Sequence, residues 1–177
     1  MKKVIIIHGW ESSPVEHWYQ EEKQILIQKG FEVLVPEMLG GSFVKEEEWV
    51  RVLADSNPDA ETVLIGHSLG APTILRFLES SSIKVDRVIL IAGFASLLNL
   101  DYPNADYPGK FVERPFNWEK IKSKANKFLI LNQDNDPWVP FAKGEELAQN
   151  LSGELVEVKG SDHFDKMDLD LINKGLH

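Results

Sequence analysis

The chain has 177 residues, a formal net charge of −9 and no cysteine. Its length and a hydrophobic content of 43% predict a single domain, spanning residues 1–177, with one continuous core. Because phosphate contacts need clustered Lys and Arg, the acidic charge argues against nucleic acid or an anionic membrane as a partner, and the missing cysteines exclude disulfides, thiolate metal sites and a cysteine nucleophile.

The N-terminal segment begins Met1-Lys2-Lys3, but the apolar run that follows extends only from Val4 to Ile7. This run is too short for a secretion signal and is typical of a strand. No apolar stretch approaches the roughly 20 residues that a membrane helix requires. We therefore expect a cytoplasmic protein without membrane contact.

Short apolar runs alternate with longer segments of helical spacing. The runs are apolar throughout, as strands buried on both faces of a parallel sheet are. In chain order, strands are predicted at 3–8, 31–36, 62–66, 85–92, 127–132 and 154–159, and helices at 14–29, 44–56, 68–80, 118–124, 141–151 and after Phe164. This order predicts an α/β fold, a three-layer doubly wound sandwich with a mainly parallel sheet of about six strands and sites at the carboxyl ends of the strands.

The connection from 93 to 117 departs from this pattern, because it shows no clean helical period. It carries five aromatic residues among prolines and a glycine, namely Phe94, Tyr102, Tyr107, Phe111 and Phe116. A loop of this length either serves a site or is disordered, and its aromatic content argues against disorder.

The pentapeptide Gly66-His67-Ser68-Leu69-Gly70 directly follows one predicted strand and leads into a helix. A GxSxG turn in this context holds its serine in a strained conformation, and side chains two residues to either side would collide with neighbouring backbone. The N-terminus of the following helix directs its amides at a bound carbonyl, so the Leu69 N–H is predicted as one oxyanion donor. A glycine-rich turn without chemistry remains the alternative for this motif alone.

A serine nucleophile needs a base, and the chain offers five histidines. His163 follows the last predicted strand through the short loop 160–162, where this architecture delivers its base. The other four are less suitable. His67 is next to the serine and would point away from it, and His8 ends the first predicted strand. His17 lies in a predicted helix, and His177 is the last residue. We therefore predict His163 as the general base.

The base needs a carboxylate, and two aspartates follow the predicted strand 127–132. Asp136 is preferred because it stands four residues before Pro140 in a DxxVP pattern, whereas Asp134 is closer to the strand end and suits a hydrogen bond within the turn. The segment lacks the glycine and distal glutamate of a calcium loop, and the chain has no glycine-rich phosphate loop, so neither a metal nor a cofactor is expected.

The loop after the first strand presents Gly9, which permits close backbone approach, and the Trp10 N–H is predicted as the second oxyanion donor. A tight strand exit is the plainer interpretation of the same His-Gly pair. The substrate pocket is expected to draw on Trp10, Leu69, Phe94, Phe116 and Trp138, and therefore to favour an apolar or aromatic acyl group of modest size.

The chain resembles the small serine hydrolases typified by retinoblastoma-binding protein nine and its bacterial relatives, within the α/β-hydrolase superfamily. The resemblance covers most of the chain and rests on the opening VIIIHGW, His17-Trp18, GHSLG, Asp136-Pro137 with Val139-Pro140, FNWEKIK at 116–122, and His163-Phe164. It implies a compact α/β-hydrolase fold and the triad Ser68, Asp136 and His163. One departure is Asp162, which stands beside the base where such enzymes commonly have glycine.

We therefore predict a serine hydrolase that cleaves an ester, amide or related acyl bond of a small-molecule substrate through an acyl-enzyme intermediate. A protein-binding module that keeps the fold without turnover is one alternative. A triad used for acyl transfer to an acceptor other than water, or for a lyase reaction, is another. The sequence identifies no protein partner and no natural substrate.

Overall fold

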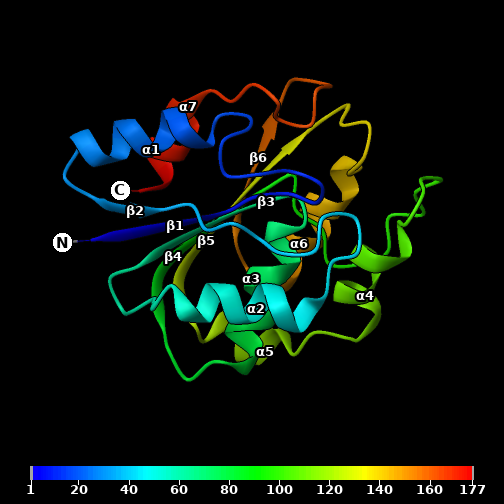
Figure 1. Cartoon of the computed structure of the whole chain (residues 1–177), viewed down its shortest axis with the longest axis horizontal. Coiled ribbons are helices and arrows are strands. Elements are labelled where there is room, and N and C mark those ends of the chain that lie inside the picture. Colours follow the sequence, from blue (N-terminus) through cyan, green and yellow to red (C-terminus); the bar gives the residue numbers. More distant parts are fainter. Residues whose placement is uncertain (1, 177) are drawn as a thin grey trace.

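The computed structural model describes residues 2–176 and contains a six-stranded parallel sheet with helices on both faces (Figure 1). The strands are β1 (Lys3–Ile7), β2 (Glu32–Leu34), β3 (Val63–His67), β4 (Val85–Ile91), β5 (Ala125–Gln133) and β6 (Glu154–Val158). The helices are α1 (Tyr19–Gln28), α2 (Glu46–Asp55), α3 (Gly70–Ser80), α4 (Asp106–Glu113), α5 (Trp118–Lys122), α6 (Phe141–Leu151) and α7 (Leu169–Gly175). The predicted doubly wound α/β fold is confirmed.

The apolar side chains of each central strand alternate between two cores. In β1, Ile5 and Ile7 pack with residues of α2, α3 and α6, whereas Val4 and Ile6 pack on the opposite face with residues of α1 and α7. Successive side chains of a strand point to opposite faces, and here both faces are covered by helices. This is why the strands read as unbroken apolar runs in the sequence.

The strand order is β2-β1-β3-β4-β5-β6, so the direction of winding reverses between β1 and β3. In an open parallel sheet, the crevice at such a reversal, outside the carboxyl ends of the strands, is where ligands bind. The loop after β1 carries Gly9 and Trp10, and the loop after β3 carries Ser68. The topology therefore brings these two loops together at one edge of the sheet.

Two helical regions differ from the sequence predictions. Helix α1 begins at Tyr19 and not at 14, because residues 14–18 form turns in which His17 has a positive φ of 52°. The region 93–117, expected as an irregular loop, contains α4, which buries Phe111 and Val112. Pro108 fits its first turn, where no N–H is needed, but Pro108 and Gly109 together hid the helical pattern.

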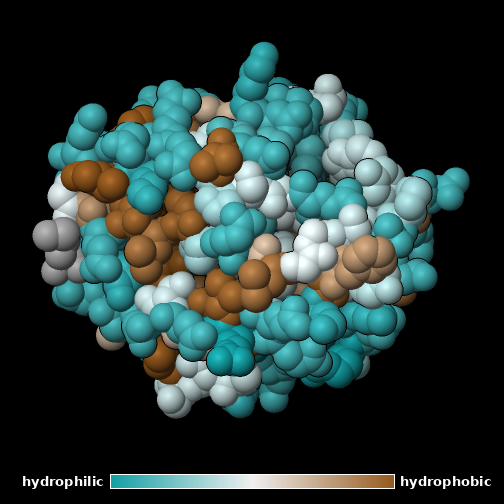
Figure 2. All heavy atoms as spheres, viewed as in Figure 1, coloured by the Kyte–Doolittle hydropathy of each residue, from teal (hydrophilic) through white to brown (hydrophobic). Residues whose placement is uncertain are grey.

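The face of the molecule in Figure 2 is mainly hydrophilic, with apolar side chains gathered over the sheet edge at β2. Tyr102 and Trp138 are also exposed by nearly half of their surface, at 43% and 45%. Within residues 2–176, no helix has both the length and the apolar character needed to cross a membrane.

Candidate active site

Ser68 lies in the sharp turn between β3 and α3 with a positive φ of 51°. The glycines on either side of it are required by close packing. A Cβ on Gly66 would lie 2.7 Å from the carbonyl carbon of Gly70, and a Cβ on Gly70 would lie 2.3 Å from the carbonyl oxygen of Ile7. The collision expected from the GxSxG spacing is therefore present, and it involves backbone atoms that cannot rotate away.

His163 and Asp136 face each other at the carboxyl ends of β6 and β5. The Nδ1 atom of His163 lies 2.7 Å from Oδ2 of Asp136, whose side chain is fully buried. The other carboxylate oxygen, Oδ1, accepts the N–H groups of Trp138 at 2.8 Å and Val139 at 2.9 Å. Because a carboxylate only accepts, this arrangement assigns the Nδ1 proton to the shared bond. In a neutral imidazole with its proton on Nδ1, Nε2 has a lone pair.

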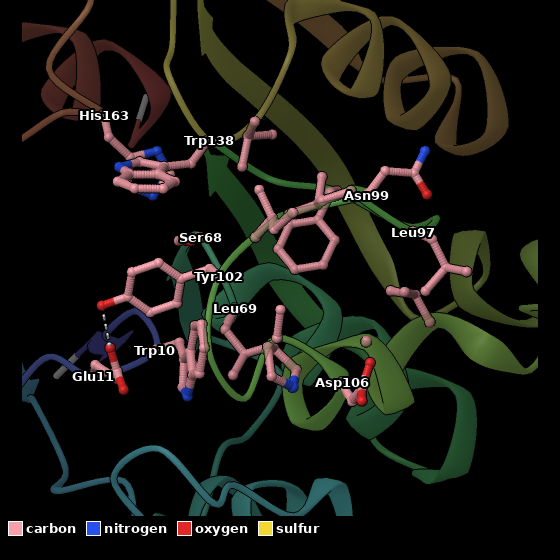
Figure 3. A pocket seen from close by; sticks show the side chains of 18 of the residues that line it. Trp10, Glu11, Ser68, Leu69, Leu97, Asn99, Tyr102, Asp106, Trp138 and His163 are labelled. Carbon is pink, nitrogen blue, oxygen red and sulfur yellow. Dashed lines mark hydrogen bonds between the residues drawn. The ribbon is translucent and has the colours of Figure 1, made fainter.

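A cavity of about 410 Å³ opens beside these residues. Figure 3 shows Ser68 and His163 on one side of it and Leu97 and Asp106 on the opposite side. Among the residues predicted for the site, those that line the cavity are Trp10, Ser68, Leu69, Phe94, Trp138 and His163.

The two predicted oxyanion residues both border the cavity. Leu69 directly precedes α3, and the first amides of a helix have no acceptor within it. The backbone at Gly9 passes close to the serine, since a Cβ on Gly9 would lie 3.3 Å from the Cβ of Ser68. The loop that carries Trp10 therefore runs beside Ser68, as the strand order requires.

Comparison with known proteins identifies the family of this chain. The family model described as serine hydrolase matches residues 4–168. The chain belongs to the serine hydrolase family.

Two curated relatives extend over most of this serine hydrolase. YdeN of Bacillus subtilis (strain 168), named as a hydrolase, is 32% identical over 167 residues, which cover 92% of this chain and 86% of YdeN. Serine hydrolase RBBP9 of Rattus norvegicus is 28% identical over 166 residues, covering 92% and 87%. The crystal structure of the B. subtilis ydeN gene product is similar with a TM-score of 0.89 at 29% identity, over 98% of both chains. The resemblance stated from the sequence motifs is confirmed, and the protein is a hydrolase enzyme.

The other aspartate after β5, Asp134, binds the end of β6 and not His163. Asp134 accepts the N–H of Gly160 at 3.0 Å and the ammonium of Lys159 at 3.1 Å, and these two bonds lower the pKa of its carboxyl. Of the two aspartates considered from the sequence, the structure brings Asp136 to the histidine. The two carboxylates have separate partners and do not converge on one point.

Asp162, the departure from the usual glycine, anchors the loop that carries His163. Its carboxylate accepts the side-chain amide of Gln133 at 2.6 Å and the N–H of Phe164 at 3.2 Å, and the bond from Gln133 lowers the pKa of Asp162 most strongly. Gln133 in turn needs space at residue 160, where a Cβ would lie 2.4 Å from its Nε2 atom. Gly160 and Asp162 thus act together to fasten the loop to the end of β5.

One pocket prediction was wrong, because Phe116 does not line the cavity. Its ring is buried beneath α3, with the guanidinium of Arg76 3.7 Å above it and Trp118 beside it. Arg76 also donates to the carbonyl of Phe111 in α4 at 2.9 Å. Phe116 therefore packs against the arginine that holds α4 and does not face the cavity.

The part of the cavity wall formed by residues between 97 and 112 was underestimated from the sequence. Tyr102 places its ring 5.6 Å from that of Trp10 and 5.8 Å from that of Trp138, and its hydroxyl donates to Glu11 at 3.3 Å (Figure 3). Apolar residues complete this wall, namely Leu97, Leu98, Leu100, Pro108 and Val112. The aromatic content of 93–117 was the sequence feature that pointed to this region.

Proposed function

We propose that this hydrolase cleaves an ester, amide or related acyl bond by nucleophilic catalysis, with Ser68 as nucleophile, His163 as general base and Asp136 as its orienting carboxylate. The observation that carries the proposal is the 2.7 Å contact between His163 Nδ1 and Asp136, beside a cavity that His163 shares with Ser68. A serine becomes a useful nucleophile only when such a base takes its proton.

In the proposed reaction, the Oγ atom of Ser68 attacks the acyl carbon while its proton passes to Nε2 of His163. The buried carboxylate of Asp136 stabilises the imidazolium that forms. The N–H groups of Leu69 and Trp10 stabilise the negative charge on the former carbonyl oxygen. His163 then protonates the leaving group, and water attacks the acyl-enzyme by the same steps to release the acid and restore Ser68.

The cavity favours an apolar or aromatic acyl group of modest size, since its volume of about 410 Å³ lies near the lower end of ligand pockets. Among the described residues that line this cavity, none is Lys or Arg, and Glu11, Asp106 and Glu113 are acidic. They repel a negatively charged acyl group, so neutral esters are proposed as better substrates than hemisuccinate esters.

The test is labelling with a fluorophosphonate probe, followed by intact mass, of the wild type, Ser68→Ala and His163→Ala. Ser123→Ala is the matched control, because this exposed serine donates only to the Lys120 carbonyl at the end of α5. We expect one label on the wild type and on Ser123→Ala and none on the other two variants.

Two outcomes would contradict the proposal. A folded wild type that takes no label would favour a hydrolase-fold protein that acts by binding alone. A labelled enzyme that returns no acid product, or whose acid product gains no oxygen from isotopically labelled water, would favour acyl transfer or lyase chemistry.

A further inference from the structure

Next to Ser68 in the chain, His67 belongs to a series of buried and part-buried hydrogen bonds that connects three loops of the site. The N–H of Gly9 lies 3.4 Å from the hydroxyl of Tyr19, the hydroxyl lies 2.6 Å from Nδ1 of His67, and Nε2 of His67 lies 2.9 Å from the carbonyl oxygen of His163. Tyr19 is 0% and His67 2% exposed, so the bonds of Gly9 to Tyr19 and of Tyr19 to His67 are shielded from solvent, and the bond to His163 is partly buried.

The direction of each bond follows from the chemistry of the groups. A carbonyl oxygen only accepts, so Nε2 of His67 carries a proton and donates to His163. Burial, and then the nearby His163, lower the pKa of His67 well below its usual value, so its ring is neutral and Nδ1 has a lone pair. The hydroxyl of Tyr19 therefore donates to Nδ1 and accepts the N–H of Gly9.

The bond to His163 acts on a backbone that needs support. His163 and Phe164 both have positive φ values, 55° and 58°, which are unfavourable for residues other than glycine. Such conformations persist only where surrounding contacts impose them. The neighbours are fixed through the carboxylate of Asp162 and the buried ring of Phe164, while the bond from His67 holds the carbonyl of residue 163 itself.

We propose that Tyr19 and His67 are positioning residues, which hold the backbone of His163 so that its imidazole meets both Asp136 and Ser68. The inference rests on the proposed role of His163 as the base. The same hydrogen bonds reach Gly9, so the loop proposed to stabilise the oxyanion and the loop of the base are held by one network.

The first test is Tyr19→Phe, which keeps the ring and removes only the hydroxyl, with 4-nitrophenyl acetate as substrate. We expect kcat to fall by about tenfold or more while KM changes by less than about threefold, because a small displacement of a catalytic group costs rate more than binding. Tyr107→Phe is the matched control, since this half-buried tyrosine lies on α4 against Phe43 and Lys110. The low-field proton resonance of the His163 Nδ1–H should shift or broaden in Tyr19→Phe and stay unchanged in Tyr107→Phe.

A second pair of variants separates hydrogen bonding from packing. His67→Gln retains one donor and one acceptor but loses the ring, whereas His67→Phe retains a ring among Trp18, Tyr19 and His17 and loses both bonds. If His67 acts through its hydrogen bonds, His67→Gln should keep a higher kcat than His67→Phe when the two variants have equal thermal stability.

The inference is overturned if Tyr19→Phe keeps the wild-type kcat, or if the kcat of His67→Phe is equal to or higher than that of His67→Gln. Should neither His67 variant fold, Tyr19→Phe decides alone, because it leaves the core volume intact. A wild type that takes no fluorophosphonate label contradicts the proposed function instead, so the two failures are distinguishable.

Discussion

The two walls of the cavity are held in place by different means. On the sheet side, Ser68 and His163 have positive φ values and lie among hydrogen bonds of 2.6–2.9 Å. On the wall formed by the segment 97–113, Tyr102 makes ring contacts and one hydrogen bond of 3.3 Å to an exposed glutamate. The groups proposed to react thus lie on the wall with the tighter constraints, and the wall proposed to meet the rest of the substrate is held by fewer hydrogen bonds. We infer that chemistry is set by the sheet and substrate preference by the residues between 97 and 113 that line the cavity, among which Tyr107 is not found.

The second wall is not loose along its whole length. Arg76, only 2% exposed, lies beside the end of α4, where it donates to the carbonyls of Phe111 and Arg114 and pairs with Glu46 and Glu79. We therefore expect substitutions to be tolerated in the loop before α4 and less so in the helix itself.

The largest effect is expected at the carboxylate of the sheet wall. Asp136→Asn presents an amide to His163 Nδ1 and favours the wrong tautomer, so kcat should fall by about 10³-fold or more. Asp134→Asn, two residues away in the same loop, is the control and should change kcat by less than about twofold. Steady-state kinetics on 4-nitrophenyl acetate measure both, and similar losses in the two variants would remove the distinction between them.

The same small change should have opposite effects on the two walls. Gly70→Ala forces a Cβ to 2.3 Å from the Ile7 carbonyl oxygen and should lower the free energy of unfolding by about 3 kcal/mol or more. Gly109→Ala in α4 meets only Leu97 at 3.4 Å and should raise it by about 0.5–1 kcal/mol, through helix propensity. Urea unfolding measures both, and a tolerated Gly70→Ala would show that the sheet wall can yield.

One further prediction concerns the pH dependence of the free energy of unfolding and involves a residue outside both walls. Glu22 on α1 is fully buried, and both of its carboxylate oxygens lack a partner among the described residues. Burial raises its pKa from 4.5 to about 7, so the folded state keeps a proton that the unfolded chain releases between these values. Its contribution to stability is therefore present below pH 4.5 and is lost as the pH rises to about 7.

Glu22→Gln cannot lose this proton, so above pH 7 it should be more stable than the wild type by about 3 kcal/mol. Below pH 4.5 the two should be similar. Urea titrations between pH 4 and 8 measure the difference, with the exposed Glu21→Gln as control. A gain that does not depend on pH would contradict the assignment, and a change in substrate preference would show that Glu22, which does not line the cavity, nevertheless affects it.

The smallest effects are expected on the looser wall. Tyr102→Ala removes the ring between Trp10 and Trp138 and should raise KM for an aromatic ester by about five- to tenfold, with little change in the free energy of unfolding. Tyr102→Phe loses only the exposed bond to Glu11 and should differ from the wild type by less than about twofold. Chain-length profiles on nitrophenyl esters measure the change, and a loss confined to kcat would assign Tyr102 to the chemistry.

The contrast between the walls also decides which features could be predicted from sequence. The six strands were found within a few residues of their ends, because helices cover both faces of the sheet and the central strands β1 and β3 are buried along almost their whole length. The GxSxG turn could be interpreted because its glycines are required by close contacts with backbone atoms, and these contacts do not depend on which side chains lie nearby. On the looser wall, α4 escaped prediction, since Pro108 and Gly109 mask a helix that tertiary packing stabilises.

The sequence by itself determined the parallel α/β sheet, the strained serine turn and the presence of a histidine and an aspartate after the last two strands. These features follow from local pattern and chain order. The tertiary structure alone decided that Asp136 and not Asp134 meets His163, that Phe116 lies under Arg76, and that the histidine beside Ser68 contacts residues 48 positions before it and 96 after it. A hydrogen bond between residues so far apart leaves no periodic trace in the chain, because only the folded sheet brings its ends together.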